Sequence, residues 1–210
     1  MAKVGSTKDQ RMRQRLTQEA ARIISEEGVK DYYLAKRKAA DRLGAPSTQN
    51  MPRNVEIQDA LREYQRLFKG ESQQANLRRL REAALGAMRF FHRFRPKLVG
   101  PVLDGSAGEW SEVSLHVFAD TPEEVAIFLM DEGIPFEPGE RRLRMQRETW
   151  EFFPVYRFIA GDVVVDLTVF THAGGRQAPR SQVDGQPMDR AGPGAVERLL
   201  DEGGALPGYG

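Results

Sequence analysis

The hydrophobic pattern of this 210-residue chain changes its period at Pro96, and that change limits the folds open to it. Before Pro96 the apolar residues recur every three or four positions, as they do on the buried face of a helix. After Pro96 short runs of apolar and polar residues alternate, as they do in half-buried strands. The sequence therefore predicts an α+β fold, with a mostly helical region over residues 1–95 and a small mixed or antiparallel sheet with flanking helices over residues 96–210.

The helical region is expected to contain four helices, over residues 11–27, 31–43, 55–69 and 75–94. The first three end at a glycine, the residue that most readily adopts the left-handed conformation after a helix C-terminus. In the second helix, Leu34 is expected to face inward. The basic run of Lys36, Arg37 and Lys38 is expected to face outward.

The second region is expected to hold five strands, over residues 97–105, 112–118, 141–148, 154–161 and 162–170. A helix is predicted between the second and third strands because Thr121, Pro122 and Glu124 form a typical helix start. The last two strands are predicted to form a hairpin that turns at Gly161 and Asp162. The Gly- and Pro-rich stretch over residues 171–194 is typical of a long surface loop.

Composition narrows the chemistry that the chain can carry. It has no cysteine and only three histidines, which excludes disulfides and leaves too few soft ligands for a structural zinc site. A metal ion here is expected to be a hard cation held by carboxylates. No apolar run is long enough to cross a bilayer, and residues 1–15 lack the apolar core of a signal peptide, so we expect a cytoplasmic protein without a membrane partner.

The net charge of +1 conceals a strong asymmetry between the two halves of the chain. Residues 1–100 hold 22 Lys and Arg against 11 Asp and Glu, whereas residues 101–210 hold 9 against 19. The basic half can meet a polyanion such as RNA or DNA, or it can pack on the acidic half. A third interpretation is that its charges are simply the solvated faces of helices.

Two of the expected strands carry polar residues that point to a binding site. The period of two places Glu112, Ser114 and His116 on one face of the second strand, and it places Asp166 on the polar face of the last. If the two strands are neighbours, Glu112 and Asp166 can share a Mg²⁺ ion bound to a nucleotide triphosphate. The competing interpretation is that these side chains form the solvent face of an ordinary half-exposed strand.

The stretch LVGPVLDGSAGEWSEVSLHVF followed by VVVDLTVF resembles the core of the nucleotidyltransferase (DNA polymerase β-like) superfamily. The resemblance covers roughly residues 85–170. It implies that Gly105 and Ser106 hold phosphate, that Glu112 and Ser114 occupy two metal-ligand positions, and that Asp166 is the third carboxylate. It also implies a nucleotide as ligand and Mg²⁺ or Mn²⁺ as cofactor, with Ser114 and His116 on the nucleotide-binding face.

The sequence departs from that family where two aspartates are usual, because Glu112 and Ser114 stand there. A hydroxyl is a poor replacement for a charged metal ligand. The resemblance therefore implies a divergent nucleotidyltransferase-like protein that binds a nucleotide or a nucleic-acid end, with Glu112 and Asp166 as the remaining catalytic acids if it still reacts.

A second function hypothesis rests on the basic N-terminal helices. Residues 19–47 have the shape of a helix, a glycine turn and a basic helix, and they loosely resemble the first two helices of a bacterial helix-turn-helix regulator. Lys36, Arg37 and Lys38 would then contact phosphates of a nucleic acid. In this alternative the chain is a non-catalytic nucleic-acid-binding or regulatory protein.

Overall fold

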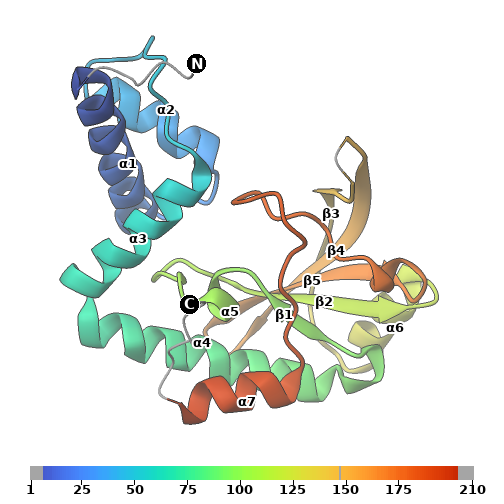
Figure 1. Ribbon diagram of the computed structural model, residues 1–210. Coiled ribbons are helices and arrows are strands. Elements are labelled where there is room, and N and C mark those ends of the chain that lie inside the picture. Colours follow the sequence, from blue (N-terminus) through green and yellow to red (C-terminus); the bar gives the residue numbers. More distant parts are fainter. Residues whose placement is uncertain (1–6, 147, 203–210) are drawn as a thin grey trace. The chain divides into compact units, whose positions relative to one another are not determined.

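A computed structural model describes residues 7–146 and 148–202 of the chain (Figure 1). It has the expected α+β class, with helices before and after a five-stranded mixed sheet. The described residues form two compact units. The first comprises the chain up to Gln73 together with residues 108–110 and 182–184, and the second comprises the remainder. A domain boundary at residue 95 remains a prediction, and residues 1–6 lie outside the described part.

The first unit is built on three helices, α1 (Thr7–Glu27), α2 (Tyr32–Arg42) and α3 (Asn54–Phe68). Their apolar faces meet in a core of small and medium side chains: Leu16, Ala20, Ala21, Ile23, Ala35, Ala39, Ala40, Ile57 and Leu61. Leu34 was expected to face inward, but it is 47% exposed. Ala35 and Ala39, four residues apart, form the buried face of α2 instead, and Leu34 lies outside that face.

An ion pair joins α1 to α3 within this unit. The Arg13 guanidinium donates two hydrogen bonds to the Glu56 carboxylate, which also accepts from the backbone N–H of Arg53 at the start of α3. The bond from Arg13 is the main reason that the pKa of Glu56 falls to about 2. Glu56 therefore both caps α3 and ties it to α1.

The second unit holds the sheet and the remaining helices. Its elements in chain order are α4 (Gly70–Phe90, whose first residues belong to the first unit), η1 (His92–Phe94), β1 (Lys97–Val99), α5 (Pro101–Asp104), β2 (Val113–Ala119), α6 (Pro122–Asp131), β3 (Glu137–Arg144), β4 (Trp150–Ala160), β5 (Val163–Thr171), η2 (Gly174–Arg176) and α7 (Pro193–Asp201).

The strands lie in the order β1-β2-β5-β4-β3. Only β2 and β5 are parallel, and every other neighbouring pair is antiparallel. One face of the sheet packs on α4, α6 and α7 around a continuous apolar core. In Figure 1, α7 runs beside α4, and Arg89 of α4 pairs with Glu197 of α7 at 2.8 Å.

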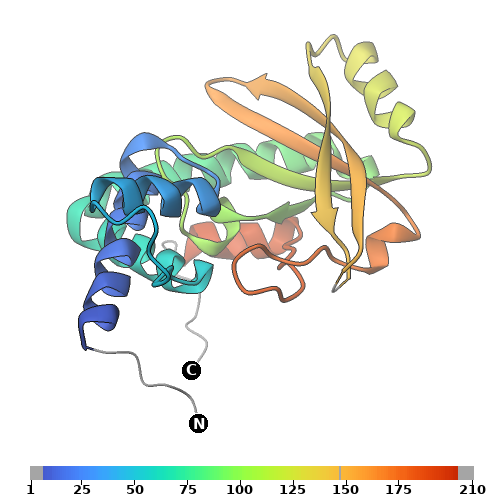
Figure 2. The same ribbon diagram turned by 90° about the horizontal axis from the view of Figure 1, so that it is seen from above.

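The segment between β5 and α7 returns past the ends of β3 and β4 (Figure 2). The N–H of Arg180 donates to the carbonyl of Arg144, and the Gln177 side chain donates to the carbonyl of Met145. The Gly- and Pro-rich stretch is therefore fastened to the edge of the sheet rather than free of it.

The hairpin prediction is confirmed, because Ala160 pairs with Val163 across a two-residue turn in which Gly161 has φ 65°. The single strand expected over residues 97–105 is wrong. β1 ends at Val99, and the short helix α5 follows because Gly100 has φ 72° and Pro101 takes the first helical position.

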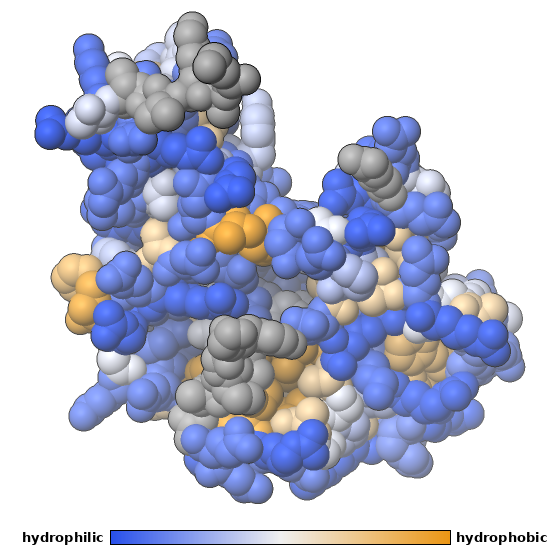
Figure 3. All heavy atoms as spheres, viewed as in Figure 1, coloured by the Kyte–Doolittle hydropathy of each residue, from blue (hydrophilic) through white to orange (hydrophobic). Residues whose placement is uncertain are grey.

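The described residues contain no helix that is both long and apolar enough to cross a membrane. On the face seen in Figure 3, hydrophilic residues predominate and apolar ones form only small patches.

Arg81 of α4 holds α5 in place from inside the core. It is 1% exposed and donates from Nε to the carbonyl of Val102 and from Nη2 to that of Leu103.

We expect Arg81→Met to lower the free energy of unfolding by about 2–3 kcal/mol, because both buried carbonyls lose their donor. Urea denaturation measures this. The exposed Arg78→Met is the control, with an expected change below about 0.5 kcal/mol, and an equal loss in both variants would contradict the anchoring role.

Candidate functional site

The parallel pairing of β2 and β5 brings together the two strands that carry the predicted site. Ser114 lies opposite Asp166, and His116 lies opposite Thr168. These side chains share the sheet face that points away from the core helices. We call this face, with the arginines that reach it from β3 and β4, the polar face. Its members are Ser114, His116, Arg141, Arg157, Asp166 and Thr168.

Asp166 is fully buried, and its charge is balanced by Arg141 of β3. Nη1 of Arg141 lies 2.7 Å from Oδ1, and Nη2 lies 2.8 Å from Oδ2. Nη1 also donates to the Thr168 hydroxyl at 3.1 Å. This bidentate geometry is a strong form of carboxylate–guanidinium pair, and it occupies both oxygens of Asp166.

Arg157 of β4 lies between the two predicted acids. Its Nη2 is 3.3 Å from Oε2 of Glu112 and 3.7 Å from Oδ2 of Asp166. The two carboxylates therefore converge on one nitrogen, which is the juxtaposition that the sequence hypothesis needed. The cation between them is a guanidinium that belongs to the chain.

This donor set does not fit a divalent cation as it is arranged. Both oxygens of Asp166 are bonded to Arg141, and the remaining ligand position is the uncharged hydroxyl of Ser114. A metal ion would have to displace Arg141 and sit beside two positive charges. The Mg²⁺ or Mn²⁺ implied by the family resemblance stays a prediction, as do the catalytic and metal-binding roles of Glu112 and Asp166.

The backbone N–H groups of the Gly105–Ser106 turn are bonded to acceptors within the same segment. Gly105 has φ 85°, and its N–H donates to the carbonyl of Pro101. The N–H of the buried Ser106 donates to Oδ1 of Asp104 at 2.9 Å, and that of Ala107 donates to Pro101. A phosphate would have to replace these bonds, so the geometry adds no support to the predicted phosphate-binding role of this turn.

His116 is a buried, neutral member of the polar face. Its Nδ1 accepts a hydrogen bond of 3.0 Å from Nε of Arg190, and its ring lies 4.6 Å from that of Phe170. Burial lowers the pKa of His116 well below its ordinary value, and the charges of Arg190 and Arg141 add to the effect. The imidazole is therefore uncharged in the folded chain at neutral pH.

The three basic residues of α2 do not form one exposed cationic face. Burial lowers the pKa of the half-buried Lys36. Lys38 pairs with Glu27 of α1 at 3.0 Å, and Nη1 of the exposed Arg37 lies 3.4 Å from the Tyr33 hydroxyl. Arg37 is thus the one member of the run that is exposed and has no acidic partner among the described residues.

The sequence hypothesis missed the arginines that dominate the site. Arg157 offered a signal in the sequence, because it stands among apolar residues in PVYRFIAG. Its side chain there points to the opposite face of the strand from Tyr156 and Phe158. Arg141 offered none, because it opens the run RRLR and resembles a solvated charge. Arg190 lies in the loop between β5 and α7, and only its three-dimensional contacts reveal it.

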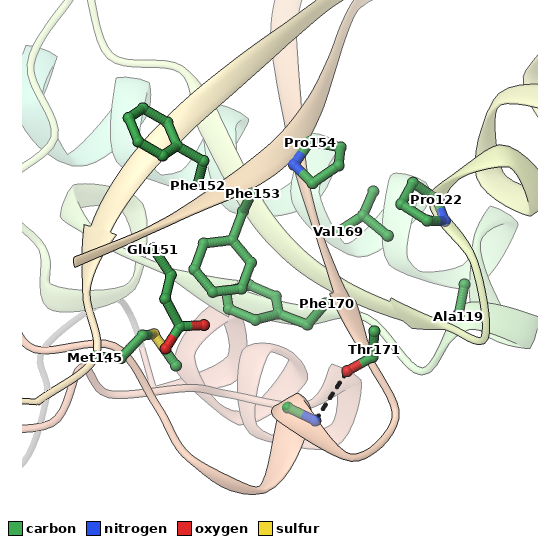
Figure 4. Close-up of a pocket in the computed structure, with 11 residues that line it drawn as sticks. Ala119, Pro122, Met145, Glu151, Phe152, Phe153, Pro154, Val169, Phe170 and Thr171 are labelled. Atoms are coloured by element: carbon green, nitrogen blue, oxygen red, sulfur yellow. Dashed lines mark hydrogen bonds between the residues drawn. The ribbon is translucent and has the colours of Figure 1, made fainter. Parts of the chain in front are cut away.

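A separate cavity of about 210 Å³ lies at the end of β2 and β5, and Figure 4 shows its lining. The ring centroids of Phe153 and Phe170 lie 4.5 Å apart on its wall with the rings tilted by 37°, and the Glu151 side chain is drawn beside them. Phe170 is four residues beyond Asp166 on β5, roughly 13 Å along the strand. None of the predicted site residues lines this cavity.

Comparison of this chain with protein-family models, with curated proteins and with solved structures finds no match.

The lowered pKa of His116 makes stability depend on pH. An unfolded chain protonates this histidine near its ordinary pKa of 6.5, whereas the folded chain keeps it neutral. Stability is therefore fully present above pH 6.5 and falls as the pH drops below it, by about 1.4 kcal/mol per pH unit until the folded pKa is reached. We expect His116→Gln to flatten this fall in urea denaturation between pH 7 and 5. The exposed His92→Gln is the control, and an unchanged slope in His116→Gln would contradict the assignment.

Proposed function

We propose that this chain is a divergent nucleotidyltransferase-like protein that binds a nucleotide or a nucleic-acid end at the polar face and does not transfer it. The observation that carries the proposal is the pair of arginines on Glu112 and Asp166. They stand where the family resemblance calls for metal ions, and they provide positive charge without one.

Arg157 is the side chain best suited to meet a phosphate. It is 44% exposed, and only its Nη2 has a partner among the described residues. The other N–H groups of this guanidinium are free to form the paired hydrogen bonds that arginine makes with phosphate. Arg141, 34% exposed, adds a second charge while it holds Asp166.

The proposed absence of transfer is supported by the same contacts. Nucleotidyl transfer needs a cation that neutralises the phosphates and positions the attacking hydroxyl. Here the acids that would hold it are committed to arginines, and Ser114 brings no charge to the second ligand position. The parallel neighbours β2 and β5, with an acid near each, support the family resemblance.

Calorimetric titration with nucleoside triphosphates, in Mg²⁺ and separately in EDTA, tests the proposal. We expect saturable binding that persists in EDTA and weakens about tenfold in Arg157→Gln, because a charge-assisted pair is lost. Arg66→Gln, which removes an exposed arginine of α3, is the matched control and should bind as the unmodified chain does.

Two results would overturn the proposal. One is that the unmodified chain binds neither nucleoside phosphates nor the end of a single-stranded oligonucleotide. The other is binding that requires Mg²⁺ and is accompanied by turnover, since that outcome would make the chain a metal-dependent enzyme.

The alternative, nucleic-acid binding through α2, has less support because Lys36 is half-buried and Lys38 is paired. It predicts steeply salt-dependent binding of RNA or duplex DNA that is lost when Lys36, Arg37 and Lys38 become alanine and survives Arg157→Gln. That pattern would favour the alternative over the polar face.

A further inference from the structure

The junction between β1 and α7 brings two basic residues to the β1 side of the polar face. Leu98 and Ala191 exchange two backbone hydrogen bonds of 2.8 and 2.9 Å, which align the segment before α7 with β1. Gly192, next in the chain, comes to lie beside Lys97: a Cβ on Gly192 would be 3.2 Å from Nζ of Lys97. Lys97 in turn lies opposite His116 of β2.

The ammonium group of Lys97 stands in an unfavourable place. The residue as a whole is partly buried, and its ammonium forms no hydrogen bond or ion pair with any residue in the described parts of the chain. Gly192 is the N-cap of α7, so this helix presents its positive end to the ammonium. A lysine here repels the helix dipole and gains nothing from within the described chain.

Arg190 adds a second charge without an acidic partner. Its Nε donates to Nδ1 of His116, and its Nη1 donates to the carbonyl of Gly175 at 2.8 Å. The guanidinium also lies 4.9 Å from the Phe170 ring. Its Nη2 is buried and has no hydrogen-bond partner in the described structure. All of these partners are neutral.

Neither of two described acids, Asp189 and Asp166, corrects this imbalance. Asp189, which precedes Arg190, is exposed and forms no ion pair with a described residue. Asp166 is saturated by Arg141. The shift of the His116 pKa agrees, because its electrostatic causes are the two cations Arg190 and Arg141 and include no carboxylate. The β1 side of the polar face therefore carries uncompensated positive charge.

We propose that Lys97 and Arg190 form an anion subsite that takes a phosphate group. Lys97 contacts the phosphate directly, and the amide of Gly194, which has no acceptor among the described residues, is placed to donate from the first turn of α7. Arg190, which is hydrogen-bonded to His116, supplies the second positive charge without contacting the phosphate itself. That the phosphate belongs to a nucleotide rests on the proposed function, whereas the subsite itself rests on these contacts.

Titration of the full chain with inorganic phosphate, at constant ionic strength, tests the subsite by calorimetry. We expect saturable binding that weakens about tenfold in Lys97→Gln, since one charge-assisted contact is lost. Lys8→Gln removes an exposed lysine of α1 and should leave the affinity unchanged. Absence of phosphate binding, or equal losses in the two variants, would overturn the proposal.

Thermal unfolding supplies a readout that a purely structural lysine would not give. Without phosphate, Lys97→Gln should be at least as stable as the unmodified chain, because the variant removes a charge that the helix end and Arg190 repel. With phosphate, the unmodified chain should gain stability and the variant should gain little. An equal gain in both proteins would contradict the subsite.

The two proposals fail in different ways. Phosphate binding that depends on Lys97, without binding of any nucleotide, would leave the subsite standing and remove the nucleotide. Nucleotide binding that depends on Arg157 and is indifferent to Lys97→Gln would remove the subsite and leave the proposed function intact.

Discussion

The buried pair of Asp166 and Arg141 is the interaction on which the polar face depends. A carboxylate without solvent contact is costly unless its charge is matched and both oxygens are bonded. Arg141 meets both conditions from β3, two strands away in the sheet, and Arg157 reaches the same acid from β4. Asp166 of β5 thus holds Arg141 of β3 and Arg157 of β4 beside it, and this contact fixes the positions of both arginines on the polar face.

This pairing changes the chemical character of an otherwise familiar arrangement. Glu112, just before β2, and Asp166, on its parallel neighbour β5, are close enough to share a cation, yet both are already paired with arginines of the same chain. The groups proposed to meet a ligand are the exposed part of Arg157 and the charge of Lys97, with Arg190 as a second positive charge behind His116. Their positive charge is the reason that an anionic ligand is proposed.

Much of the architecture could be predicted from the sequence. The change of period at Pro96 indicated the α+β class, and the two residues at 161–162 indicated the hairpin. The prediction of one strand over residues 97–105 was wrong, because Gly100 and Pro101 end the strand and start a short helix. Periodicity also could not identify Arg141 as the partner of Asp166, because an arginine on an edge strand looks like a solvated charge until the sheet order is known.

The parallel pairing of β2 with β5 also has a consequence for folding. The helix α6 and the strands β3 and β4 lie between them in the chain. β2 and β5 therefore cannot pair, and the polar face cannot form, until this intervening segment has folded back. The local hairpin of β4 and β5 can form early, whereas closure onto β2 bridges a long loop and is entropically expensive. Assembly of the acids and arginines is accordingly a late, cooperative event, and a truncated or nascent chain that stops short of β5 contains none of it.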